Sequence, residues 1–250
     1  MPVSLKELAS ALDAEFSFYR GQDESQNGLQ VHGNANVRKG AVACDAALET
    51  IEKTAFLKAD FLFVHHGLLW KKEVPRTVKA IQKRIQAARK SNLSVYAMHL
   101  PLDAHPTLGN NALLAKAIGL KNATPCVMEE GAFLGLCGDL DASPDALAEA
   151  VKKKLGSARL FSFGPEKVYR VAVCTGSGGF AALEAKKEGF DALVVGEFKH
   201  SDYHFAKESG VNVIEAGHYN SEILGPKAVG KWIEKKFGVP FEFIDAPTGL

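Results

Sequence analysis

Two adjacent histidines, His65 and His66, follow the apolar run 61–64 and precede Gly67. Imidazoles at the end of a buried strand suit a transition metal such as zinc, iron, nickel or copper. Adjacent residues of a strand point to opposite faces. Both rings can reach one ion only if the chain leaves the strand here, which Gly67 makes easy. Otherwise the two rings reach two ions, one from each side. A lone buried histidine is more often a core residue, so further donors must support this interpretation.

Such donors follow other predicted strands. His99 stands four residues before Asp103, His218 stands four before Glu222, and Glu197 follows a further strand. Ligand sites of open α/β sheets lie beyond the carboxyl ends of the strands, so these side chains are expected to converge. A helical turn would place His218 and Glu222 on one face, which makes Glu222 the candidate to bridge two ions. Nitrogen and oxygen donors without a CxxC thiolate pair argue against a structural zinc site.

The hydrophobic pattern predicts the elements that position these side chains. Ser4 and Glu7 form a capping box before a first helix. Three apolar strands then alternate with helical segments over residues 40–103. This βαβαβ order predicts a mostly parallel sheet that is covered by helices. Ser143 and Pro144 predict the start of a later helix.

The second half of the chain repeats the first. AVACD aligns with VAVCT, ADFLFVHH with FDALVVGE, and SVYAMHLPLD with NVIEAGHYNSE. We therefore predict an α/β protein with two similar α/β lobes, mixed and mostly parallel sheets, and pseudo-symmetric halves around a metal cleft. The predicted lobes are residues 1–125 and 126–250, unless the two intertwine as one domain.

The glycine-rich segment TGSGG, residues 175–179, lies between a predicted strand and helix. Its backbone amides could cradle an anion. It matches neither GxGxxG nor a P-loop, so a tight strand–helix turn is the preferred interpretation. His32, His105 and His204 have no such pattern of donors to support them and are expected on the surface or in loops, although His105 lies close to Asp103.

The composition limits the classes of partner that the protein is expected to bind. The 250 residues carry 30 basic and 29 acidic side chains, which offers no global attraction for nucleic acid. No apolar run approaches the roughly 20 residues of a membrane span, and no signal peptide is evident. Cys44 and Cys174 sit in apolar runs and are expected in the core. We expect a protein of the reducing cytoplasm.

Several motifs occur in order along nearly the whole chain: NGLQV, VHHG, MHLPLD with GNNALLAKAIGL, CTGSGG, GEFKH and GHYNSE. They resemble the Nif-three-like family, whose members are named GTP cyclohydrolase 1 type 2 homologues, in its short form without an inserted domain. One departure is DESQ before NGLQV, where the family often has Trp-Asp-Asn.

The resemblance implies two α/β lobes around a dinuclear metal site, in a toroidal homohexamer. The residues that match the family's metal ligands are His65, His66, Asp103, His218 and Glu222. Glu222 would be shared by both ions, and His99 and Glu197 would lie behind the ligands or approach the substrate.

These expectations favour a metal-dependent hydrolase acting on a small-molecule substrate. Two divalent ions (Zn, Mn, Fe, Co or Ni) would lower the pKa of a water and stabilise an oxyanion, while His99 or Glu197 relays a proton. The family name implies that the substrate is GTP and that the reaction opens its imidazole ring. Hydrolysis of another nucleotide or of a phosphoester would use the same pair of metal ions. The alternative is a non-catalytic metal-binding scaffold or interaction protein that forms a ring.

Overall fold

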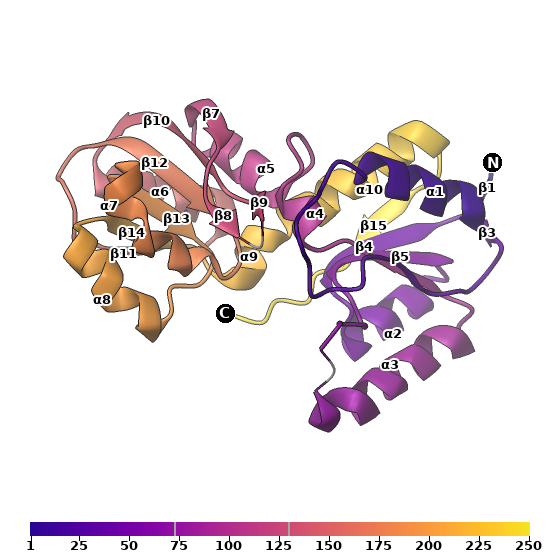
Figure 1. Cartoon of the computed structure of the whole chain (residues 1–250). Coiled ribbons are helices and arrows are strands. Elements are labelled where there is room, and N and C mark those ends of the chain that lie inside the picture. The colour runs from indigo at the N-terminus through magenta and orange to yellow at the C-terminus, as the bar shows by residue number, and fades with distance from the viewer. Residues whose placement is uncertain (73, 130) are drawn as a thin grey trace. The chain divides into compact units, whose positions relative to one another are not determined.

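The computed structural model describes residues 1–72, 74–129 and 131–250 (Figure 1). Unit 1 contains Met1–Leu102 and Gly225–Ala246, and unit 2 contains Asp103–Leu224 and Pro247–Leu250. This division differs from the predicted lobes 1–125 and 126–250. Strand β7 (Lys121–Pro125) pairs within the sheet of unit 2 although it precedes residue 126, and the late strand β15 (Phe241–Phe243) pairs within the sheet of unit 1.

A five-stranded mixed sheet of order β15-β4-β5-β6-β2 forms the centre of unit 1. Its first four strands run parallel, and the edge strand β2 runs antiparallel to β6. The strands are β2 (Gly28–Val31), β4 (Gly40–Asp45), β5 (Phe61–His66), β6 (Ser94–Ala97) and β15 (Phe241–Phe243). β4, β5 and β6 are almost entirely buried, which explains why they read as continuous apolar runs.

Helices cover both faces of this sheet, with α2 and α3 on one face and α1 and α10 on the other (Figure 1). The remaining elements of unit 1 are β1 (Val3–Ser4), α1 (Leu5–Glu15), β3 (Asn36–Val37), α2 (Leu48–Phe56), η1 (Pro75–Thr77), α3 (Val78–Lys90), α4 (Leu100–Asp103) and α10 (Leu224–Phe237). Both α4 and α10 contain a residue of unit 2. The Ser4 half of the predicted capping box of α1 is confirmed, because the Glu7 N–H donates to Ser4 Oγ at 3.1 Å.

The sheet of unit 2 has the order β11-β14-β13-β12-β10-β7. β12, β13 and β14 are parallel, as β4, β5 and β6 are in unit 1, and β11 is an antiparallel edge strand like β2. The predicted α/β class is confirmed, and the strand order repeats as the sequence halves predicted. The strands are β7 (Lys121–Pro125), β8 (Met128–Glu129), β9 (Ala132–Phe133), β10 (Leu136–Ala142), β11 (Arg159–Phe161), β12 (Val168–Cys174), β13 (Ala192–Val195) and β14 (Asn212–Glu215).

The helices of unit 2 include one that differs from its prediction. They are α5 (Asn110–Ala117), α6 (Pro144–Leu155), η2 (Gly178–Leu183), α7 (Ala185–Glu188), α8 (His200–Ser209) and α9 (His218–Glu222). Ser143 caps α6 as predicted, accepting the Ala146 N–H at 3.2 Å. FAALEAKKEG forms the short pieces η2 and α7 instead of one helix. The glycine pair 178–179, which precedes this segment and begins η2, has low helix propensity, and Gly178 lies so close to β12 that a Cβ would be 2.6 Å from Cys174 Cβ.

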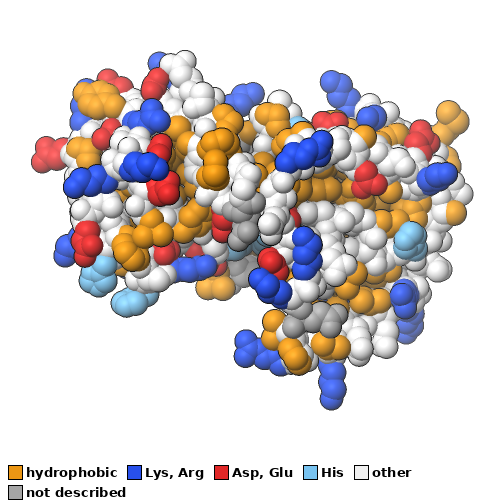
Figure 2. Space-filling model, in the orientation of Figure 1, with side chains coloured by type: hydrophobic (Ala, Val, Ile, Leu, Met, Phe, Trp, Pro, Cys, Tyr) orange, Lys and Arg blue, Asp and Glu red, His pale blue; other side chains and the backbone are white. Residues whose placement is uncertain are grey.

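The predicted core cysteines are buried, with Cys44 1% and Cys174 4% exposed. On the face shown in Figure 2, Lys and Arg side chains are interspersed with Asp and Glu. Within the described ranges, we find no helix with both the length and the apolar character needed to cross a membrane.

Asp60, at the entry to β5, is a buried carboxylate with several donors. It accepts the Arg38 backbone N–H at 2.9 Å, Arg38 Nη2 at 2.7 Å and Asn34 Nδ2 at 2.7 Å. Burial raises the pKa of Asp60, but these hydrogen bonds and the Arg38 charge outweigh it and hold the pKa below its ordinary value of 3.8. Its stabilisation is therefore present above pH 3.8 and is lost as the pH falls through the lower folded-state value.

We expect Asp60→Asn to lower the free energy of unfolding by about 1–3 kcal/mol at pH 7, because an amide NH2 would replace one acceptor oxygen at this buried position and the charge that attracts Arg38 would be lost. Urea denaturation at pH 7 and at the lowest pH where both proteins fold measures the effect, which should shrink in acid. Asp141→Asn is the control, since its ion pair with Lys167 is exposed and should matter by less than about 1 kcal/mol. An equal difference at both pH values would contradict the assignment.

Candidate metal centre

Three histidines gather at the carboxyl ends of β5 and β6 in unit 1. One ring nitrogen from each of His65, His66 and His99 lies within 4.8 Å of the others. The ring centroids are 4.6 Å, 5.1 Å and 5.4 Å apart. Gly67 permits the chain path after the pair, because a Cβ there would lie 2.6 Å from Ala97 Cβ. The rings of the adjacent pair are thus close enough to serve one site.

Each of these imidazoles is held through its Nδ1 atom. His66 Nδ1 lies 2.8 Å from Asp45 Oδ1, and His99 Nδ1 lies 2.8 Å from Asp23 Oδ1. His65 Nδ1 lies 3.1 Å from a main-chain carbonyl oxygen. A proton on Nδ1 that is donated to such an acceptor leaves the Nε2 lone pair for a metal, which is the usual arrangement of metal-binding histidines.

The two carboxylates that hold these rings were not among the predicted site residues. Asp45 ends β4 and pairs with His66 across the parallel ladder, so the rule of strand ends would have found it. Asp23 precedes β2 in a loop, where no periodic pattern marks it. It accepts the Ser25 N–H at 2.9 Å and Asn27 Nδ2 at 2.8 Å. Burial raises the pKa of Asp23, but its hydrogen bonds and the imidazole charge hold that pKa below its usual value.

Unit 2 contains a second donor cluster. The i,i+4 spacing in α9 brings His218 Nε2 within 2.9 Å of Glu222 Oε2, as the sequence predicted. His218 Nδ1 lies 2.9 Å from Glu197 Oε1. An oxygen of Asp103 lies within 4.8 Å of an oxygen of Glu222. Asp103, His218 and Glu222 are therefore together in unit 2, whereas His65 and His66 belong to unit 1.

The electrostatics of this cluster favour a cation. Burial lowers the pKa of His218, but the hydrogen bonds and charges of Glu222 and Glu197 outweigh it and raise the pKa to about 9. The imidazole is therefore protonated at neutral pH, between two carboxylates. A metal ligand must be neutral imidazole, so binding of a metal here would release a proton and would strengthen as the pH rises.

The TGSGG turn makes room for Glu222. Gly176 has φ +60°, and a Cβ there would collide with Glu222 Oε1. The Gly176 N–H donates to Ser221 Oγ at 3.0 Å, and the Thr175 N–H donates to Asn111 Oδ1 at 2.8 Å. These amides are already engaged, which fits the predicted turn and not an anion cradle.

The two residues predicted to relay protons have different surroundings. Glu197 accepts hydrogen bonds on both oxygens, from His218 Nδ1 and, at 2.9 Å, from Ser177 Oγ. His99 has the Trp70 ring edge-on at 5.1 Å between centroids and lies within the histidine group of unit 1. The surroundings of Glu197 suit orientation of His218.

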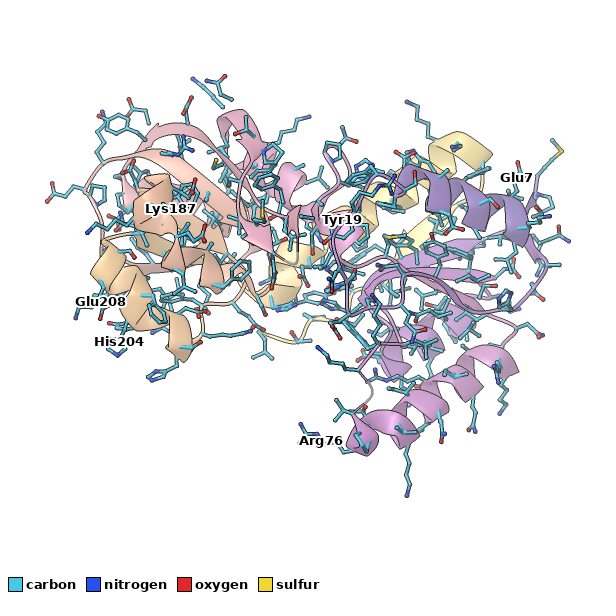
Figure 3. The ribbon with its side chains drawn as sticks, in the orientation of Figure 1. Glu7, Tyr19, Arg76, Lys187, His204 and Glu208 are labelled. Atoms are coloured by element: carbon cyan, nitrogen blue, oxygen red, sulfur yellow. The ribbon has the colours of Figure 1, made fainter. Side chains whose placement is uncertain are left out.

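One of the three other histidines is buried. His32 and His204 are exposed, and Figure 3 shows His204 on α8. His105 is only 5% exposed, and its Nδ1 accepts the N–H groups of Thr107 at 3.2 Å and Leu108 at 3.0 Å. His105 lies in a loop, which agrees with the expectation, and its ring is buried there because it closes the turn after α4.

The donor sets fit divalent transition metals. Unit 1 offers three imidazoles in mutual reach, and unit 2 offers an imidazole with two buried carboxylates. Imidazole suits zinc, copper, iron and nickel, and carboxylate extends the range to manganese. The structure thus supports candidate metal-ligand groups in both units.

Known proteins resemble the chain over its whole length. A family model described as Duf34/NIF3 (NGG1p interacting factor 3) matches residues 3–248. A relative from Pyrococcus abyssi, named GTP cyclohydrolase 1 type 2 homolog, is 41% identical over 249 residues, covering 98% of this chain and 99% of the relative. A relative of the same name from Archaeoglobus fulgidus is 39% identical over 248 residues, covering 99% and 100%.

Solved structures extend the likeness to the fold. The structure of TTHA1606 from Thermus thermophilus matches with a TM-score of 0.89 and 38% identity, covering 99% of this chain and 100% of that chain. HcgD from Methanocaldococcus jannaschii matches with a TM-score of 0.86 and 25% identity, covering 98% and 99%. The chain belongs to the Duf34/NIF3 family.

Proposed function

We propose that this protein binds two divalent metal ions and is a metal-dependent hydrolase of a small-molecule substrate. The main support is the state of the imidazoles, because His65, His66, His99 and His218 all have Nδ1 within hydrogen-bond distance of an oxygen acceptor. A ring whose Nδ1–H is held in this way is pre-organised to present Nε2 to a metal once Nε2 carries no proton, and three of the four rings, those of His65, His66 and His218, belong to the proposed ligands.

The proposed ligands come from both units. They are His65, His66, Asp103, His218 and Glu222, with Glu222 shared by the two ions. This set combines imidazole nitrogens with carboxylate oxygens, the donors that divalent transition metals bind.

When bound, the ions would supply Lewis acidity and lower the pKa of a water. Asp45, Asp23 and Glu197 would keep the imidazoles oriented. We assign proton transfer to His99 and not to Glu197, because both oxygens of Glu197 already accept hydrogen bonds. The name of the relatives makes GTP the first substrate to test, followed by other nucleotides and phosphoesters.

Elemental analysis of protein purified without added metal tests the proposal, with about two ions per chain expected. The same samples are assayed against GTP and a phosphoester panel. Turnover that requires the ions supports the hydrolase. Tight binding of two ions without turnover on any substrate contradicts it and supports the scaffold, in which a ring-shaped homohexamer would act as an interaction platform. A metal content near zero after loading and dialysis would overturn both.

A further inference from the structure

A pocket of about 410 Å³ opens in unit 2 beside the His218 cluster. It lies beyond the carboxyl ends of β13 and β14, the usual place for ligands in α/β sheets. Gly217, which lines it, directly precedes His218, and Glu197, which also lines it, accepts the hydrogen bond from His218 Nδ1. A molecule in this pocket would therefore lie next to proposed metal ligands of unit 2.

The carboxylates of the pocket are committed to donors. Glu215 Oε1 accepts the Phe198 N–H at 2.9 Å. Glu197 accepts hydrogen bonds from Ser177 and His218. Oxygens of both carboxylates thus already accept hydrogen bonds within the protein, and an anion would be held by the cations in the rest of the pocket.

The two cations of the pocket, Arg159 and Lys199, form fewer interactions with charged groups of the protein. Arg159 places its guanidinium 4.5 Å from the centroid of the Phe161 ring. Across residues 1–72, 74–129 and 131–250, no carboxylate forms an ion pair with Arg159. Lys199 Nζ lies 3.8 Å from Glu197 Oε2, close to the limit for an ion pair. A guanidinium stacked on a ring is partly immobilised and still offers in-plane N–H groups to a phosphate.

We propose that this pocket is a subsite for a phosphate group of the substrate, held by Arg159 and Lys199 beside His218. The inference rests on the proposed function in taking the ligand to be the substrate of the metal centre. The volume lies within the range of small-molecule sites, about 300–1,000 Å³. The subsite therefore selects a phosphorylated small molecule, such as a nucleotide, over its neutral nucleoside.

Calorimetric titration of metal-loaded protein with GTP and with guanosine, at fixed ionic strength, tests the subsite. We expect Arg159→Ala to weaken GTP binding about tenfold, as loss of a charge-assisted hydrogen bond does, and to leave guanosine binding unchanged. Arg159→Lys should recover part of the loss. The matched control is Lys187→Ala, an exposed cation on α7 (Figure 3), which should bind GTP like the wild type.

Two results would overturn the subsite. One is GTP binding by Arg159→Ala that is as tight as in the wild type, and the other is a wild type that binds neither GTP nor inorganic pyrophosphate. Turnover assays of the same samples, with and without metal, separate this from the proposed function. If GTP binding depends on Arg159 but no metal-dependent turnover occurs, the subsite stands and the hydrolase proposal fails.

Discussion

Glu222→Gln is expected to reduce the bound metal from about two ions per chain to at most about one. Turnover should fall by about 10²–10³, the loss seen when one electrostatic stabiliser of an active site is removed. Glu222 is 3% exposed and lies against His218, and a neutral amide of similar shape keeps the packing but cannot bridge two cations. Elemental analysis and initial rates measure the two effects.

A second readout does not need metal. In the metal-free protein, the pKa of His218 should fall from about 9 when the Glu222 charge is removed, and NMR titration of the imidazole measures it. Glu208→Gln is the control, because Glu208 is an exposed acid on α8 (Figure 3). Two bound ions together with full turnover in Glu222→Gln would refute the bridging role.

His66→Ala is expected to lower turnover by about the same factor, although His66 belongs to the other unit. If one dinuclear centre uses both residues, the double variant His66→Ala/Glu222→Gln should be hardly worse than the more damaging single variant, because residues that act together are not additive. Initial rates of the four proteins measure this coupling. Losses that multiply would mean two independent sites.

Milder changes around His66 test whether its orientation matters. Asp45→Asn retains the ring but weakens its acceptor, and we expect metal affinity to fall about 10–100-fold. His204→Ala removes an exposed imidazole from α8 and should change neither metal content nor turnover.

Much of the site was predictable because its residues follow strands that the sequence marks clearly. The apolar run before His65 identified β5. Because β5 and β6 are parallel neighbours, their carboxyl ends lie at the same edge of the sheet, and His99 after β6 therefore joins His65 and His66. The spacing of His218 and Glu222 likewise predicted their contact across one helical turn.

The partners of these residues were less predictable. Asp23 holds His99 across 76 positions of the chain, and no local pattern connects them. His105 lies in a loop, as expected, but the sequence did not show that its ring is buried and accepts two backbone N–H groups. The late segment 225–246 joins unit 1, since β15 pairs with β4.

The amino-acid order by itself determined the strands, two helix caps and the type of donor at each strand end. Those features depend on side-chain periodicity and on hydrogen bonds within a few residues, which a linear sequence displays directly. Only the tertiary structure decided which acceptor sets the tautomer of each imidazole, which unit each segment joins and which charges stay uncommitted. Such pairings depend on the packing of segments that are distant in the chain, and local propensity does not show which of these segments will come into contact.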